Sequence, residues 1–135
     1  MGFTNAANYN DKVLVIGRVG THGIVQRLNN PCWASDNTLV ITSLYYEYVY
    51  HILKRVDYTA LNRGSTQPLI TQGDMKNLTI TLPNSEILQR FEKLVGSLML
   101  QYESNMIENE YLANLRDVLL PRLMSGEIDV SKIEL

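Results

Sequence analysis

A chain of 135 residues, 45% hydrophobic and 19% charged, has the composition of one globular core, which excludes wholesale disorder. Its single cysteine excludes an internal disulfide framework and a multi-cysteine metal site, and no apolar run approaches the ~20 residues that span a bilayer. The net charge of −2 is unevenly divided. Residues 1–83 carry seven Lys and Arg against five Asp and Glu (+2), and residues 84–135 carry five against nine (−4). The two parts are therefore expected to have different partners, and neither carries a broad basic field.

Three short strands are predicted near the start of the chain. The apolar, β-branched run at 12–16 indicates a buried strand, and the turn GRVGTHG at 17–23 follows it. Further strands are predicted at 24–28 and 38–42. The glycines are spaced GxxGxxG, and a strand pattern follows them instead of a helix. A dinucleotide-binding or phosphate-binding glycine loop is therefore excluded.

A helix and a fourth strand are predicted next. Ser43 is expected to cap a helix over residues 44–56. One face of that helix carries an apolar set: Tyr46, Val49, Tyr50, Leu53 and Val56. After a polar loop, residues 78–82 alternate with period two, which predicts a strand. Residues 1–83 are thus expected to form a mixed sheet with at least one helix.

The character of the chain changes after Pro83, where one long helix is predicted from Ser85 to about Leu120. Asn84 or Ser85 can cap it, and Glu86 stands in the first turn, where the helix dipole favours an acid. About 35 residues make a rod of ~50 Å, several times the usual helix length.

The end of this helix is predicted from two residues. Pro121 is expected to kink or end it, because proline lacks the N–H that an inner turn needs. Gly126 is expected just past the last turn, where a left-handed backbone conformation suits glycine.

Apolar residues recur along the long helix at spacings of three and four, as in a coiled coil. The members of this seam are Ile87, Phe91, Leu94, Leu98, Leu112, Leu115 and Leu119. Its middle is polar, because Gln101, Asn105 and Glu108 fall in the same register. So small a sheet domain cannot cover a seam of this length, so its outer half is expected to meet another helix, in a second copy or a different chain. The alternative is a helix folded back on the body.

No pattern in the sequence predicts a catalytic centre, a metal site or a cofactor site. His22 and His51 are isolated from acidic neighbours at ligand spacing. The tyrosines around His51 could stack on bases beside Lys54 and Arg55, but their helical spacing favours a role in the core.

Two polar loops are the candidates for binding. They hold small polar side chains, backbone N–H groups and one guanidinium each, which suit phosphate oxygens and groove edges. The candidate residues are Arg18, Thr21 and His22 in the first loop, and Arg63, Ser65, Thr66 and Gln67 in the second. The alternative is plain turn chemistry, in which hydroxyl groups close local hydrogen bonds, and composition alone favours neither.

Several stretches together resemble the specificity (S) subunit of type I restriction-modification enzymes. They are NRGSTQPLIT at 62–71, NLTITLP at 77–83 and LRDVLLPRLMSGEIDV at 115–130. GRVGTHG with DNTL at 36–39 also matches the glycine turn and following strand of that family's target-recognition domains. The resemblance covers residues 12–130.

This resemblance implies an α+β fold with three parts. Residues 1–83 would be a small mixed-sheet target-recognition domain, residues 84–125 one long coiled-coil-type helix for spacing and dimerisation, and residues 126–135 a tail. The opening of the recognition domain is not matched. We therefore expect the C-terminal part of an S subunit, with only part of its DNA-reading surface.

The resemblance also implies a function and a set of partners. Such subunits are non-catalytic and cytoplasmic, need no cofactor, and read a bipartite target in double-stranded DNA through two recognition domains. Their helices dock the methyltransferase (M) subunits of a complex that also holds restriction (R) subunits. With one domain and one helix, this chain is expected to form a homodimer or to pair with another S-type helix.

Two hypotheses follow for the isolated chain. In the first it reads one half of a DNA target, and the seven loop residues contact phosphates or hold the framework, since the second loop recurs in members with different targets. In the second it is an assembly fragment that binds partner helices without useful DNA affinity.

Overall fold

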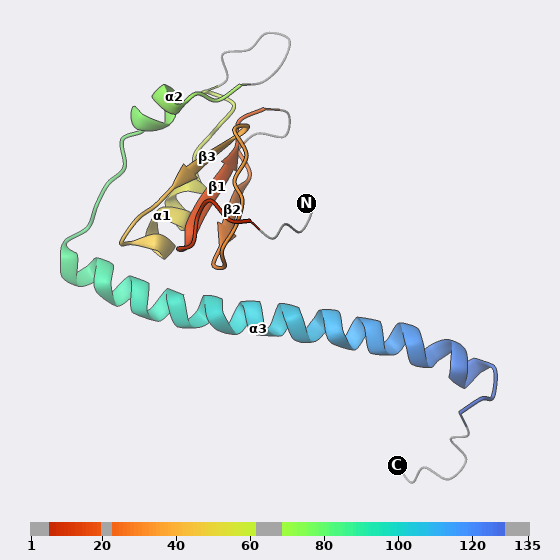
Figure 1. Cartoon of the computed structure of the whole chain (residues 1–135). Coiled ribbons are helices and arrows are strands. Elements are labelled where there is room, and N and C mark those ends of the chain that lie inside the picture. Colours follow the sequence, from red (N-terminus) through yellow and green to blue (C-terminus); the bar gives the residue numbers. More distant parts are fainter. Residues whose placement is uncertain (1–5, 20–22, 62–68, 129–135) are drawn as a thin grey trace. The chain divides into compact units, whose positions relative to one another are not determined.

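The computed structural model describes residues 6–19, 23–61 and 69–128 (Figure 1). The chain divides into two compact units, Met1–Val95 and Gly96–Leu135. The secondary-structure elements are β1 (Val13–Gly17), β2 (Val25–Leu28), β3 (Thr38–Ile41), α1 (Tyr46–Leu53), α2 (Gln72–Lys76) and α3 (Ser85–Met124). The α+β class predicted from the sequence is confirmed.

The three predicted strands at the start of the chain are confirmed and form one sheet in the order β2-β1-β3. Both strand pairings are antiparallel, with Ile16 opposite Val25 of β2 and opposite Leu39 of β3. As the central strand, β1 is buried along four consecutive residues, Val13 to Ile16. Its unbroken apolar run therefore reflects burial on both faces of the sheet.

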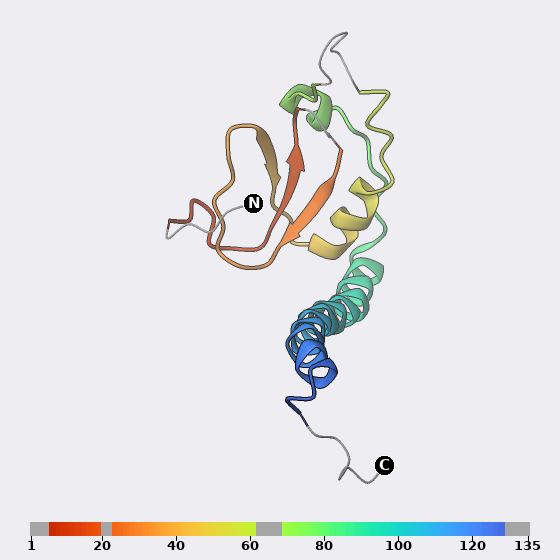
Figure 2. The same cartoon turned by 90° about the vertical axis from the view of Figure 1, so that its right-hand side faces the viewer.

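The apolar core lies between the sheet and α1, which the two views at right angles place beside each other (Figures 1 and 2). Leu14 and Ile16 of β1 meet Tyr46 and Leu53 of α1 there, and Ile70 is fully buried among them. Val49 and Tyr50 also pack on this core, so the predicted apolar face is confirmed within α1. The predicted end at residue 56 is wrong: α1 ends at Leu53, and Val56 packs on the core from the turn that follows it.

A buried ion pair joins β2 to α1. The Arg27 guanidinium donates to a carboxylate oxygen of Glu47, and both side chains are less than a tenth exposed. The same guanidinium lies over the rings of Tyr46 and Tyr50, at 5.5 and 5.4 Å from their centroids. Removal of either partner would leave the other charge buried and unpaired. The pair therefore fixes the position of α1 on the sheet.

The beginning of α1 differs from the prediction. Ser43 is not the cap: the N-cap position is Tyr45, which makes no capping bond through its side chain. The Ser43 hydroxyl instead accepts a bond from the Tyr45 amide. The first amides of α1, those of Glu47 and Tyr48, donate to the two carboxylate oxygens of Glu92, from α3, at 3.1 and 2.8 Å. A residue 45 positions away therefore does the work that the local pattern assigned to a serine.

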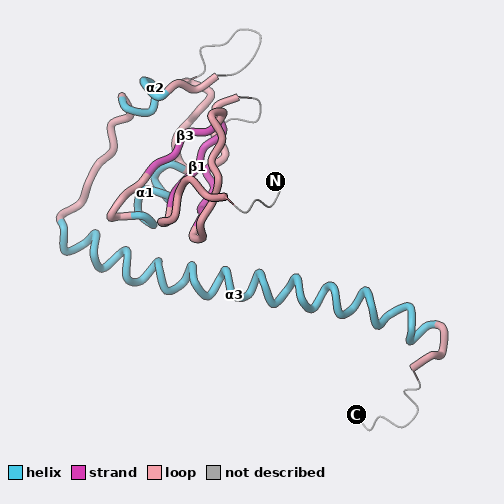
Figure 3. Tube along the Cα trace, viewed as in Figure 1, coloured by secondary structure: helices cyan, strands magenta, loops and turns pink. Residues whose placement is uncertain are grey.

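The fourth predicted strand, at 78–82, is wrong. These residues join no sheet and run as an extended loop between α2 and α3 (Figure 3). The alternation still has a cause, because Leu78 and Ile80 turn inward while Thr79 and Thr81 are exposed. The Tyr48 hydroxyl donates to the Thr81 carbonyl, so a side chain holds the segment where a neighbouring strand was expected.

A short helix, α2, was missed by the sequence interpretation. Its signal is a capping box: the Thr71 hydroxyl accepts from the Asp74 amide, and the Asp74 carboxylate accepts from the Thr71 amide. The Thr71-x-x-Asp74 spacing could have revealed it.

The long predicted helix is confirmed as α3, which has 40 residues. The Asn84 side chain caps it by accepting from the Ile87 amide at 2.9 Å, one of the two predicted caps. The helix does not end at Pro121 but continues to Met124, and the Ser125 amide donates to the Pro121 carbonyl. Gly126 follows at φ +74°, in the predicted left-handed conformation. Pro121 has no N–H to donate within the helix, but its carbonyl still accepts the Ser125 amide, so the last turn forms.

Candidate functional site

The roots of the two candidate loops lie side by side at one end of the sheet. The first loop leaves β1 after Gly17 and enters β2 at Val25, and the second ends where Leu69 begins the approach to α2. Val19 forms a bridge with Leu69, and the Ile70 amide donates to the Arg18 carbonyl at 3.0 Å. Segments 50 residues apart in the sequence are thus joined by backbone contacts at the roots of both loops.

Arg18 reinforces this junction with its side chain. Its Nε donates to the Ile70 carbonyl at 3.4 Å, and one Nη donates to the Asp36 carbonyl at 3.3 Å. Its backbone amide also donates to the Asn37 carbonyl. The guanidinium therefore links the first loop, the turn before β3 and the root of the second loop. Two of its five N–H donors serve this framework among the described residues.

The exit of the first loop is fixed by Gly23 and Tyr58. Gly23 has φ +80°, and a Cβ placed on it would lie 2.7 Å from the Tyr58 ring carbons. Tyr58 is buried, and its hydroxyl donates to the Leu53 carbonyl at 2.9 Å. Burial raises the pKa of Tyr58 to about 12. The turn thus needs glycine for its backbone conformation and for the space that the aromatic ring occupies.

The seven predicted loop residues are only partly visible. Arg18 lies in the described structure and has the framework role given above. The others, Thr21, His22, Arg63, Ser65, Thr66 and Gln67, lie outside the described residues. Their roles stay predictions, but the roots of the two loops that carry them are adjacent.

The tyrosine-rich helix α1 belongs to the core, as its spacing indicated. Tyr46 is buried, and the ring of Tyr48 packs edge to face on Phe91, with centroids 5.7 Å apart. His51 makes a similar contact with Phe91 at 6.1 Å. Lys54, which follows the last residue of α1, places its ammonium group over the Tyr50 ring. These aromatic faces are engaged within the chain and are not free for stacking on bases.

The predicted seam of α3 divides into exposed residues and one packed residue, Phe91, while Leu119 is half-buried. Ile87, Leu94, Leu98, Leu112 and Leu115 are between 40% and 63% exposed. Phe91, by contrast, packs on α1, and the buried residue of the first turns is Leu88, which the interpretation left out. Further along α3, Ile107, Tyr111 and Val118 are also widely exposed. The helix therefore carries more uncovered apolar surface than the predicted seam alone.

The described residues contain neither a metal-binding cluster nor a membrane-spanning helix. No group of three or more His, Cys, Asp or Glu side chains in the described ranges is placed to hold a metal ion. Within the same residues, no helix has the length and apolar content that crossing a membrane requires.

Comparison with known proteins identifies relatives over most of the chain. Residues 1–114 match the family model described as type I restriction modification DNA specificity domain. The specificity subunit of the type I restriction enzyme MjaIX from Methanocaldococcus jannaschii is 28% identical over 93% of this chain. That of HindI from Haemophilus influenzae is 31% identical over 90% of it. The chain spans 31% and 30% of the length of these two relatives, less than a third of each.

Proposed function

Because this chain belongs to the family of type I restriction modification DNA specificity domains, we propose that it is a non-catalytic module that reads one half of a bipartite DNA target. The two loops at the Gly17 end of the sheet form the surface that faces the duplex. Duplex DNA presents closely spaced phosphates, so a compact cluster of hydrogen-bond donors in the loops can bind them. A large positive net charge on residues 1–83 is therefore not required.

One observation carries this proposal: Arg18 and Val19 are bonded to Ile70 and Leu69. A groove or a pair of phosphates is read by groups from both loops only if the loops are held at a fixed separation. The backbone bonds and the Arg18 side chain fix the roots of the two loops, which sets the separation at which the loops leave the sheet. Arg63 and His22 would contact phosphates, and the hydroxyl and amide side chains beside them would contact phosphate or sugar oxygens.

We further propose that the exposed residues of α3 dock helices of other subunits. A partner helix would cover Leu94, Leu98, Leu112 and Leu115, either from a second copy or from another S-type chain, and the methyltransferase would dock beside it. The support is the exposure of these leucines together with their spacing of three and four. The competing reading, an assembly fragment without useful DNA affinity, requires the same helix contacts but no role for the loops.

Binding to a fluorescent duplex at 50 and 200 mM salt separates these two readings. A module that neutralises several phosphates loses affinity steeply between the two conditions, because bound counterions are released on binding. Arg63→Gln is expected to weaken binding and to lower the slope of log K against log salt by about 1.

Lys12→Gln is the matched control for Arg63→Gln, because it removes the same charge. Lys12 is exposed and precedes Val13, at the opposite end of β1 from the loops. Equal loss of affinity in both variants would assign binding to net charge alone. Millimolar affinity that does not change with salt would support the assembly reading instead.

A further inference from the structure

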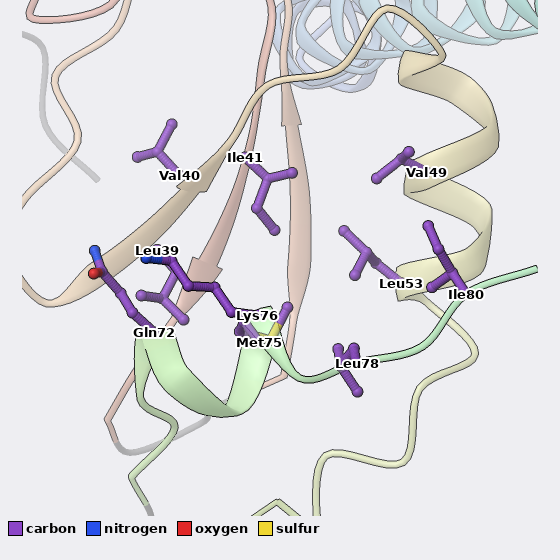
Figure 4. Close-up of a pocket in the computed structure, with 10 residues that line it drawn as sticks. All are labelled: Leu39, Val40, Ile41, Val49, Leu53, Gln72, Met75, Lys76, Leu78 and Ile80. Atoms are coloured by element: carbon purple, nitrogen blue, oxygen red, sulfur yellow. The ribbon is translucent and has the colours of Figure 1, made fainter.

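An apolar pocket opens beside the edge strand β3. Its volume is about 390 Å³, and β3, α1, α2 and the segment 78–80 enclose it (Figure 4). Its lining is Leu39, Val40, Ile41, Val49, Leu53, Gln72, Met75, Lys76, Leu78 and Ile80. Only Gln72 and Lys76, both from α2, bring polar groups, and they do so at one end.

The alternation of hydrogen-bonded and non-bonded residue pairs between β1 and β3 shows that β3 has backbone groups on its outer edge, the edge away from β1. The Arg18 amide donates to the Asn37 carbonyl, which makes residues 18 and 37 a hydrogen-bonded pair. In an antiparallel ladder such pairs alternate, so Leu39 and Ile41 bond to β1 while the N–H and C=O of Val40 point away from it. Among the described residues β3 has no second neighbouring strand.

The opposite wall of the pocket is also strand-like and unpaired. Residues 78–82 are extended and join no sheet in the described structure; Leu78 and Ile80 are half-buried, whereas Thr79, Thr81 and Leu82 are exposed. Leu78 and Ile80 point into the pocket that Val40 and Ile41 border from β3 (Figure 4). An apolar cavity is thus flanked by two extended segments, at least one of which offers open backbone donors and acceptors.

We propose that this pocket is a docking site for a β-strand of a partner protein, added to the sheet at β3. The strand would pair with Val40 through its backbone and insert alternate aliphatic side chains between β3 and residues 78–80. A small apolar molecule would satisfy the cavity but not the Val40 edge, whereas an extended peptide satisfies both. Lys76 at the polar end favours a strand that carries an acidic residue at one terminus. This inference does not depend on DNA binding.

Titration of a labelled peptide tests the proposal. The probe is a nine-residue peptide of alternating valine and threonine that ends in glutamate, followed by anisotropy with the full chain. A matched peptide with proline at the central position keeps the apolar content but loses a backbone N–H. We expect the proline peptide to bind about tenfold more weakly, and Lys76→Glu to weaken the glutamate peptide two- to fivefold.

A variant of the chain tests the same edge from the other side. Val40→Pro removes the outward N–H without touching the bonds to β1, because edge strands tolerate proline at such positions. It should weaken the valine–threonine peptide about tenfold and leave the proline peptide unchanged.

Three results would overturn the proposal. They are no binding of the valine–threonine peptide, equal binding of both peptides, or a dimer of the chain that Val40→Pro abolishes in sedimentation. The last would assign the edge to a second copy. If Val40→Pro does not fold, the comparison of the two peptides on the unaltered chain still decides.

Discussion

At the residue scale, single side chains hold the sheet end that carries the loops. Arg18 was a candidate for phosphate contact or for a framework role, and in the structure its guanidinium bonds to two backbone carbonyls of neighbouring segments. The sequence pattern could place it in a glycine turn but not beside Ile70, because that contact joins segments 52 residues apart. Framework and ligand roles for such a residue are compatible, since arginine has five donors.

Replacing Gly23 tests how strictly the first loop is built. Gly23→Ala places a Cβ 2.7 Å from the Tyr58 ring and holds a non-glycine residue at φ +80°. We expect a loss of about 2 to 4 kcal/mol in the free energy of unfolding, measured with urea. Gly96→Ala is the control: nothing lies within 4 Å of its added Cβ, and it should stabilise α3 by roughly 0.5–1 kcal/mol. A Gly23→Ala chain as stable as the parent would refute the packing described here.

Tyr58 should give the fold a measurable dependence on alkaline pH. Its folded pKa is raised to about 12 by burial, above the unfolded value of about 10, so the neutral phenol favours the folded state. This contribution is fully present below pH 10 and is lost as the pH rises toward 12. Tyr58→Phe should therefore be less stable than the parent at pH 8, and the difference should shrink by pH 11.5. A constant difference across this range would mean that the phenol is not buried as described.

At the element scale, the sequence predicted those helices and strands whose spacing of apolar residues matches the way they are buried. Strand β1 and helix α3 have long uniform patterns, and both were located to within a few residues. Two of the failures have a shared cause, since each depended on a distant partner, whereas the capping box of α2 was a local signal that the interpretation overlooked. Residues 78–82 have the alternation of a strand but no neighbouring strand to pair with, and α1 takes its cap from Glu92 instead of Ser43. Such contacts leave no local signature.

The Glu92 cap can be measured as a contribution to stability. Glu92→Ala removes both acceptors from the first amides of α1 and should cost about 0.5–2 kcal/mol in urea unfolding. Glu92→Gln keeps one acceptor oxygen and should lie between the two. Glu110→Ala, at an exposed position of α3, removes the same charge without a cap and serves as the reference. If Glu92→Ala matched that reference, the carboxylate would have no capping role.

At the scale of the whole molecule, the exposed leucines of α3 are the residues that the proposed partner helix would cover. Leu98 and Leu115 are 57% and 40% exposed, in a helix whose pattern continues past both. Leu98→Glu combined with Leu115→Glu should convert an oligomer to a monomer in sedimentation velocity, since buried charges cannot be paired in an apolar seam. Ser104→Glu with Asn114→Glu adds the same charge at exposed polar positions and should leave the mass unchanged. An oligomer that survives the leucine changes would show that other residues hold it together.

The proposed separation of DNA binding by the loops from partner binding by α3 also belongs to this scale. The charge balance already separated a mildly basic part from an acidic one, and family membership supports assigning DNA to the first. Which loop residues touch the duplex could not be predicted from spacing, because turn chemistry and phosphate binding use the same small polar side chains.

Hydrogen exchange followed by mass spectrometry, with and without a 30-base-pair duplex at low salt, tests the central claim most directly. The account predicts slower exchange of amides in residues 17–24 and 61–71 when DNA is bound, and no change in residues 96–124. Slower exchange confined to the long helix, with both loops unaffected, would contradict it.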